Sequence, residues 1–265
     1  MAANKNKSFV LVHGAMHGGW CWKPVRPILL RAGYDVYAPT LTGMGERAHL
    51  AHLADAATGL SVHVRDIENV LEYEDLDGVI LVGHSYGGMV VTAAAESCWR
   101  RIERIVYLDA YVPDDGQSLY DIQPEATVRI FKKWADAWGG GRRVVPSRSF
   151  PENWGIFDEE LKAWVFHRLE DYPLRCSEEK VSLVCPEAAA IKRSYIRCTG
   201  LTPSGRIVAA DFQSSVEKAM RGGWDFYEIQ AGHDAMLTHP EAVAGLLIKS
   251  AGGPALKINK KREKE

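Results

Sequence analysis

A serine between two glycines stands where an apolar stretch of the sequence stops. In "GVILVGHSYGGMVV", residues 78–91, a β-branched run ends at Gly83, and a helical pattern rich in Ala and Val follows Gly87. A strand-to-helix turn this tight holds the central residue of G-x-S-x-G in a strained conformation that lifts its side chain clear of the backbone. We therefore predict that the Ser85 hydroxyl is a nucleophile. A glycine-rich turn with a capping serine is the weaker interpretation.

A serine hydroxyl attacks only when a base takes its proton, and histidine is the usual base. Of the nine histidines, His233 falls in the loop between the last predicted strand and the last predicted helix. This position fits the chain order Ser…acid…His. His63 falls in a helical pattern, His239 resembles the cap of the final helix, and His84 is expected to point away from Ser85. We predict that His233 is the base.

Strand patterns alternate with helical patterns along most of the chain. The expected strands are apolar on both faces, as in sheets covered by helices on each side. This alternation predicts an α/β fold with a doubly wound, mainly parallel sheet. The expected strands are residues 8–14, 34–40, 78–83, 102–110, 193–199 and 224–232. The expected helices are residues 22–32, 62–73, 86–98, 211–221 and 240–250.

The interval 113–190 breaks this rhythm, because it is rich in aromatic residues and carries no clear strand. We predict a helical lid here, inserted between two strands and lying over the carboxyl ends of the sheet, where such sheets bind ligands. Aromatic residues that only pack the insertion onto the core remain the alternative. Residues 1–112 and 191–253 then form the core, and residues 254–265 form a disordered tail.

Composition and charge exclude several kinds of partner. The 265 residues are 46% hydrophobic and 25% charged, which is ordinary for a soluble globular protein. A net charge of −2 offers no field that attracts nucleic acid or an anionic membrane. The basic tail from Lys257 is mixed with glutamates, so a nucleic-acid arm is its weaker interpretation. We expect no nucleic-acid partner and no membrane partner, and we leave a homodimer open.

Cysteine spacing and the lack of targeting patterns predict a cytoplasmic protein. The five cysteines are scattered and lack C-x-x-C spacing, so neither a disulfide framework nor a zinc site is expected. The apolar run "FVLV" near the start is too short for a signal peptide, and no segment reaches the length of a membrane span. "GHSYGG" lacks the spacing of nucleotide-binding loops, so we expect no cofactor and no metal.

Four stretches of the sequence resemble the plant-type methylesterase and hydroxynitrile lyase family of α/β-hydrolases, which includes salicylate-binding esterases. The resemblance covers nearly the whole chain and implies the α/β-hydrolase fold. The four stretches are "FVLVHGAMHGGWCW" (9–22), "VILVGHSYGGMV" (79–90), "FPENW" (150–154, more loosely) and "GHDAML" (232–237).

The resemblance also implies an oxyanion hole made of two backbone N–H groups, those of Ala15 and Tyr86. Backbone donors suit this task because they are in place before charge develops on the carbonyl oxygen. Lyases of the rubber-tree type carry a threonine and a lysine where this chain has Gly14 and Asp234. The lysine helps to hold the departing cyanide, and Asp234 has the opposite charge. The resemblance is therefore to the esterase branch.

The acid that orients the histidine is the open question. The family places an aspartate in a Y-I-x-C-T-x-D pattern, whereas this chain reads "YIRCTGL", with Leu201 at that position. Asp109 ends the preceding strand, where some α/β-hydrolases carry the acid, and we favour it. Asp211 is the rival, and a loop-capping role for Asp109 stays open. Asp234, next to His233, is expected to project away.

Together these residues predict a serine hydrolase that cleaves a small apolar or aromatic carboxylic ester through an acyl-enzyme. The expected partner is thus a small-molecule ester, and the aromatic insertion suggests an apolar pocket for it. Two alternatives remain. One is a hydroxynitrile lyase with the same triad, and the other is a non-catalytic ligand-binding protein on the same fold.

Overall fold

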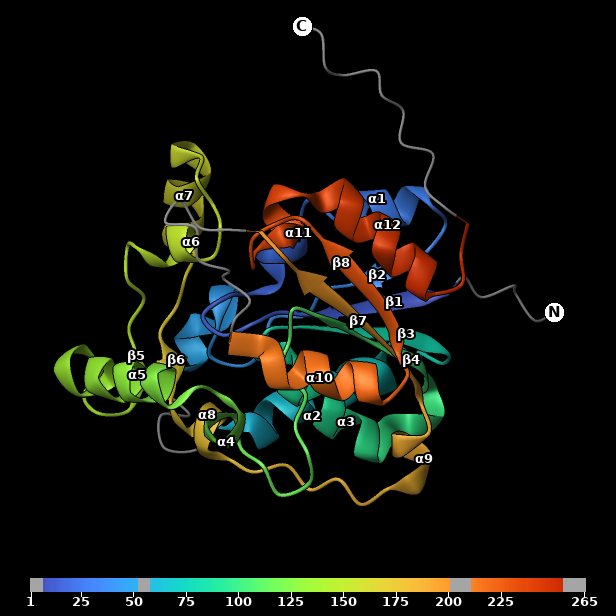
Figure 1. Cartoon of the computed structure of the whole chain (residues 1–265), viewed down its shortest axis with the longest axis horizontal. Coiled ribbons are helices and arrows are strands. Elements are labelled where there is room, and N and C mark those ends of the chain that lie inside the picture. The colour runs from blue at the N-terminus through green and yellow to red at the C-terminus, as the bar shows by residue number, and fades with distance from the viewer. Residues whose placement is uncertain (1–6, 52–57, 201–210, 255–265) are drawn as a thin grey trace, which may run out of the picture.

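The computed structural model describes residues 7–51, 58–200 and 211–254, which surround a six-stranded sheet (Figure 1). All neighbouring strands in this sheet are parallel, and their order is β2-β1-β3-β4-β7-β8. The predicted doubly wound parallel sheet is therefore confirmed. The strands are β1 (Ser8–Val12), β2 (Asp35–Tyr37), β3 (Val79–His84), β4 (Ile102–Leu108), β7 (Lys192–Cys198) and β8 (Asp225–Ile229).

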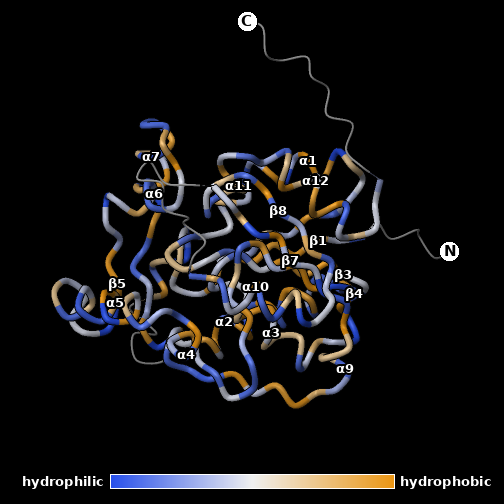
Figure 2. Tube along the Cα trace, in the orientation of Figure 1, coloured by the Kyte–Doolittle hydropathy of each residue, from blue (hydrophilic) through white to orange (hydrophobic). Residues whose placement is uncertain are grey.

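The central strands are buried on both faces, which explains why their sequences are continuous apolar runs. Every residue of β1 and β3 is buried, whereas the edge strands β2 and β8 are partly exposed. Figure 2 shows the hydrophobic residues concentrated along these central strands. A strand covered by helices on both sides has no solvent face, so polar residues do not alternate along it.

Helices cover both faces of the sheet. In Figure 1, α1, α11 and α12 lie on one face, and α2, α3 and α10 lie on the other. The helices are α1 (Arg26–Arg31), α2 (Leu60–Tyr73), α3 (Gly87–Cys98), α10 (Gln213–Arg221), α11 (Ala235–Thr238) and α12 (Pro240–Ser250). Short 3-10 helices accompany them, among them η1 (Gly19–Trp22), η2 (Gly45–Leu50) and η3 (Trp99–Arg101).

Most of the regular elements between β4 and β7 are helices, and α5, α6 and α7 among them lie beyond the ends of the strands (Figure 1). This segment also contains one two-residue antiparallel pair, β5 with β6, which the sequence analysis did not anticipate. Two residues are too short a run to show a period-2 pattern. The elements are α4 (Leu119–Ile122), α5 (Glu125–Trp138), β5 (Arg143–Val144), α6 (Phe150–Asn153), α7 (Glu159–Phe166), β6 (Tyr172–Pro173), α8 (Arg175–Glu178) and α9 (Pro186–Ala189).

The division into a core and a lid at residues 113–190 stays a prediction. The predicted disordered tail falls almost entirely on residues 255–265, which lie outside the described residues, as does Leu201. Within the described ranges, no helix combines the length and the apolar character that crossing a membrane requires.

All five cysteines carry free thiols. Cys21, Cys176 and Cys198 are buried, and burial raises the pKa of each of these thiols. A buried thiol with a raised pKa stays protonated and is a poor nucleophile. These three side chains therefore act as small apolar groups in the packing.

The parallel sheet brings four sequence-distant loops to one edge. The carboxyl ends of β1, β3, β4 and β8 lead into the stretches that contain Ala15, Ser85, Asp109 and His233. Because parallel strands all end on the same side, these residues converge there, next to the point where the chain reverses its winding direction.

Replacement of a central core residue tests the packing of this sheet. Ile80, on β3 between β1 and β4, is fully buried. We expect Ile80→Ala to lower the free energy of unfolding by about 2–5 kcal/mol, because it removes buried methyl groups and leaves a cavity. Urea denaturation measures this change. Tyr73→Ala, at a residue that is 82% exposed, is the control and should change stability by less than about 0.5 kcal/mol. Equal changes in the free energy of unfolding for the two variants would contradict the placement of Ile80 in the packed core.

Candidate active site

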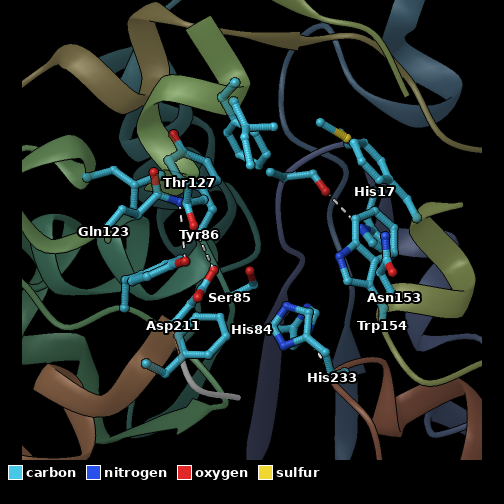
Figure 3. A pocket seen from close by; sticks show the side chains of 18 residues that line it. His17, His84, Ser85, Tyr86, Gln123, Thr127, Asn153, Trp154, Asp211 and His233 are labelled. Carbon is cyan, nitrogen blue, oxygen red and sulfur yellow. Dashed lines mark hydrogen bonds between the residues drawn. The ribbon is translucent and has the colours of Figure 1, made fainter. Parts of the chain in front are cut away.

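A cavity of about 290 Å³ lies at the carboxyl edge of the sheet, between the strand ends and the helices of the insertion. Ser85 and His233 both line it, and Figure 3 shows their side chains facing this space. Thr127 of α5 and Asn153 of α6 line the opposite side. The cavity is therefore shared between the sheet and the insertion.

Ser85 occupies the tight turn that its sequence predicts. Its φ of 54° lies in the left-handed region, which a non-glycine residue adopts only under strain. A Cβ at Gly83 would come within 2.6 Å of the Gly87 carbonyl oxygen, and one at Gly87 within 2.8 Å of the Val12 carbonyl oxygen. The two glycines are thus required by close backbone contacts on each side of the serine.

His233 is held by a buried carboxylate. Its Nδ1 donates to Oδ2 of Asp109 over 2.7 Å, and Asp109 is fully buried. The other carboxylate oxygen accepts from the Cys198 backbone N–H at 3.2 Å. With the proton on Nδ1, the Nε2 of His233 carries a lone pair and can accept a proton. Within the described ranges Nε2 makes no hydrogen bond, and neither does the Ser85 hydroxyl.

Asp211, the rival acid, has a different partner. Its Oδ2 accepts from the Thr127 hydroxyl at 3.1 Å, and both side chains line the cavity. The next residue, Phe212, does contact His233, because its ring stacks on the imidazole with centroids 5.0 Å apart. The structure thus places the carboxylate of Asp109, and not that of Asp211, on the imidazole.

Two backbone N–H groups are available beside Ser85. Ala15 and Tyr86 both line the cavity, and within the described ranges neither backbone N–H donates a hydrogen bond. Tyr86 directly precedes α3, so the positive end of that helix dipole also faces this point. Donors without a partner in the free protein are available to a ligand oxygen.

Three polar residues around His233 were not assigned a role by the sequence analysis. His84, which was expected to point away from Ser85, lines the same cavity, and its Nε2 donates to the His233 carbonyl oxygen at 3.0 Å. His17 lines the cavity as well and lies 3.2 Å from Asp234. No local pattern links residues 217 positions apart in the chain.

The charge states of these histidines differ because their surroundings differ. Burial lowers the pKa of His84 well below its ordinary value, so this ring is neutral. Burial alone would also lower the pKa of His17, but the Asp234 carboxylate outweighs it and raises that pKa. His84, His233 and Asp234 place candidate metal-ligand atoms within 4.8 Å of one another. Hydrogen bonds within the protein engage Nδ1 of His233, Nε2 of His84 and Oδ2 of Asp234, whereas the buried Oδ1 of Asp234 has no hydrogen-bond partner among the described residues.

Comparison with known proteins identifies the family. The model of the alpha/beta hydrolase family matches residues 9–246, and the chain belongs to that family. Its relatives identify the branch as the esterase type that the sequence predicts, and they favour neither the lyase nor the non-catalytic alternative.

Two relatives and one solved structure illustrate the similarity. The chain is 37% identical to the carbendazim hydrolyzing esterase of Nocardioides sp. (strain SG-4G), over 89% of this chain and 96% of that protein. It is 29% identical to salicylic acid-binding protein 2 of Nicotiana tabacum, over 93% and 98%. An extracellular α/β-hydrolase from a Paenibacillus species superposes with a TM-score of 0.78 at 24% identity, over 92% and 98%.

A substitution at Gly14 tests how closely the loop after β1 approaches the serine. A Cβ at Gly14 would lie 2.9 Å from Cβ of Ser85 and 3.1 Å from Nδ1 of His84. We expect Gly14→Ala to displace the serine and to slow its labelling by a fluorophosphonate about 100-fold, the cost of a displacement near 1 Å. Labelling rates measure this effect, and thermal unfolding verifies that the variant folds. A folded variant that labels at the wild-type rate would contradict the contact.

Proposed function

We propose that Ser85, His233 and Asp109 form the catalytic triad of a serine esterase that cleaves a small apolar or aromatic carboxylic ester. The 2.7 Å hydrogen bond between His233 and Asp109 carries this proposal. It leaves Nε2 of an imidazole available in the same cavity as a serine held at a strained turn.

The proposed reaction has two halves. In the first, the Ser85 oxygen attacks the ester carbonyl while Nε2 of His233 accepts the hydroxyl proton and then donates it to the departing alcohol. In the second, water attacks the acyl-enzyme while Nε2 of His233 accepts a proton from it. His233 then donates this proton to the Ser85 oxygen as the carboxylic acid leaves. Asp109 stays ionised throughout, because its task is to hold the correct tautomer and to stabilise the imidazolium.

The backbone N–H groups of Ala15 and Tyr86 are proposed to bind the oxyanion of each tetrahedral intermediate. Among the described residues neither N–H has a hydrogen-bond acceptor, which supports this role. Fixed donors stabilise the transition state more than the substrate because the negative charge develops only there.

The cavity supports a compact substrate. Its walls are largely aromatic and aliphatic, and they include Phe131, Phe150, Trp154 and Phe212. At about 290 Å³ it lies near the lower end of the range for small-molecule sites. One relative is named for carbendazim hydrolysis and another for salicylic acid binding, and both names fit a small ligand.

We also propose that the protein acts in the cytoplasm, which the five free thiols support, since reducing compartments keep thiols in this form. The partner in this proposal is a small-molecule ester, and nucleic acid is not a partner. A homodimer stays a prediction.

Substitution of the two candidate acids separates their roles. We expect Asp109→Asn to lower kcat about 10⁴-fold, because an uncharged partner no longer holds the working tautomer of His233. Asp211→Asn is the matched control, since its carboxylate binds Thr127, and it should stay within about tenfold of wild type. Steady-state kinetics on p-nitrophenyl acetate measure both, and Ser85→Ala and His233→Ala define the background. If only Asp211→Asn is inactive, the acid has been assigned wrongly.

A substrate panel tests the size of the cavity and the type of reaction. We expect methyl benzoate and p-nitrophenyl acetate to be hydrolysed, and p-nitrophenyl dodecanoate to have a far lower kcat/KM, because its acyl chain exceeds the cavity. Mandelonitrile should release no cyanide above the uncatalysed rate, since Asp234 stands where a lyase carries lysine. Dodecanoate turnover equal to that of acetate would refute the size argument, and catalysed cyanide release would refute the esterase assignment.

A further inference from the structure

His17 is a buried imidazole whose two nitrogens both face hydrogen-bond acceptors. Nδ1 lies 2.8 Å from the Ala15 carbonyl oxygen, and Nε2 lies 3.2 Å from Oδ2 of Asp234. His17 is 2% exposed and Asp234 is fully buried. A carbonyl oxygen and an ionised carboxylate can each accept a hydrogen bond but cannot donate one.

The proton count follows from these two contacts. A neutral imidazole has one N–H and could satisfy only one of the two acceptors, whereas an imidazolium donates to both. An ionised Asp234 next to a neutral His17 would leave an unpaired charge in the interior, which is strongly destabilising. A neutral His17 facing a protonated Asp234 would satisfy the same two contacts, but the carboxylate raises the pKa of His17, which favours the imidazolium paired with an ionised Asp234.

Three other ionisable groups around this pair, His13, His84 and the Cys21 thiol, are uncharged. The imidazole of His233 also lies near Asp234, and its own carboxylate partner is Asp109. Burial lowers the pKa of His13 to about 3 and lowers the pKa of His84 well below its ordinary value. Burial raises the pKa of the Cys21 thiol, so it stays protonated. His13 directly follows β1, His84 ends β3 and Cys21 lies in η1. The insertion contributes the ring of Trp154, 5.1 Å from that of His17. Asp234 is therefore the counter-charge that pairs directly with His17.

The loop that contains Ala15 has a strained backbone and needs to be held. Met16 has a φ of 65°, which is costly for a residue with a side chain. The bond from His17 to the Ala15 carbonyl closes the loop around Met16. The bond to Asp234 joins the loop to the residue directly after His233.

From this arrangement we infer that His17, as an imidazolium paired with Asp234, is a positioning residue. It holds Ala15 with its N–H toward the reacting centre and ties that donor to the loop of the catalytic base. This inference rests on the proposed function, because it assigns Ala15 the oxyanion role. The inference adds a requirement beyond the triad: the second ring proton of His17, buried away from the reacting atoms, keeps the backbone N–H of Ala15 in place.

Nitrogen-15 NMR of the histidine rings tests the charge directly in the wild-type protein, without any substitution. We expect both ring nitrogens of His17 to be protonated at pH 7, while His13 shows one protonated and one unprotonated nitrogen in the same spectrum. A neutral His17 ring, with its proton on either nitrogen, overturns the inference. This measurement does not depend on turnover, so it can fail while the esterase proposal stands.

Asp234→Asn tests the positioning role. Without the carboxylate, burial dominates and the pKa of His17 falls, so the ring is neutral at pH 7. We expect kcat on p-nitrophenyl acetate to fall 10- to 100-fold with KM changed less than threefold. We also expect nitrogen-15 NMR of this variant to show a neutral His17 ring at pH 7. An unchanged kcat, or a loss accompanied by an equally large rise in KM, overturns the positioning role, whereas an inactive wild type overturns the proposed function instead.

The ion pair should also make the free energy of unfolding depend on pH. The folded-state pKa of His17 is raised above its ordinary 6.5, so the pair stabilises the fold fully below pH 6.5. That stabilisation is lost as the pH rises through the folded-state pKa. Urea denaturation should show this loss with rising pH in wild type, whereas Asp234→Asn, in which burial lowers the pKa of His17, should instead lose stability as the pH falls below 6.5. A stability difference between the two that does not vary with pH contradicts the ion pair.

Discussion

A buried hydrogen bond between the carboxylate of Asp109 and the ring of His233 connects residues 124 positions apart and organises the cavity. It requires that β4 and β8 end at the same edge, which only a parallel sheet with its crossovers provides. Burial removes competing water from the bond, so the imidazole has one orientation. The position of Ser85 matters chemically only because this orientation leaves Nε2 available in the same cavity.

Backbone strain is concentrated around that cavity. Within the described ranges, four non-glycine residues have a positive φ, and three of them, Met16, Ser85 and Asp109, lie at the ends of β1, β3 and β4. Each conformation costs free energy that the packed strands must offset. The rigid sheet therefore holds the nucleophile, the candidate acid and the oxyanion loop in conformations that the isolated segments would not keep.

The buried histidines around the cavity differ in the direction in which their pKa values are shifted. Burial lowers the pKa of His13 and of His84, neither of which hydrogen-bonds to a carboxylate, whereas the Asp234 carboxylate hydrogen-bonded to His17 raises the pKa of that ring. The same side-chain type thus takes two charge states within one cluster, according to whether a counter-charge is present. Asp234, which sequence comparison treats as a lyase-versus-esterase marker, is a partner of His17 in the folded protein.

The sequence by itself determined the features that depend on neighbours in the chain. The turn around Ser85 follows from close glycine contacts, the strands follow from apolar runs buried on both faces, and His233 follows from its place after the last strand. The sequence favoured Asp109 over Asp211 but did not decide between them, because both are aspartates near strand or helix ends. Only the tertiary structure decided which carboxylate meets the imidazole, and it alone paired His17 with Asp234. Such pairings depend on where distant strand ends meet in space, and no local pattern encodes that distance.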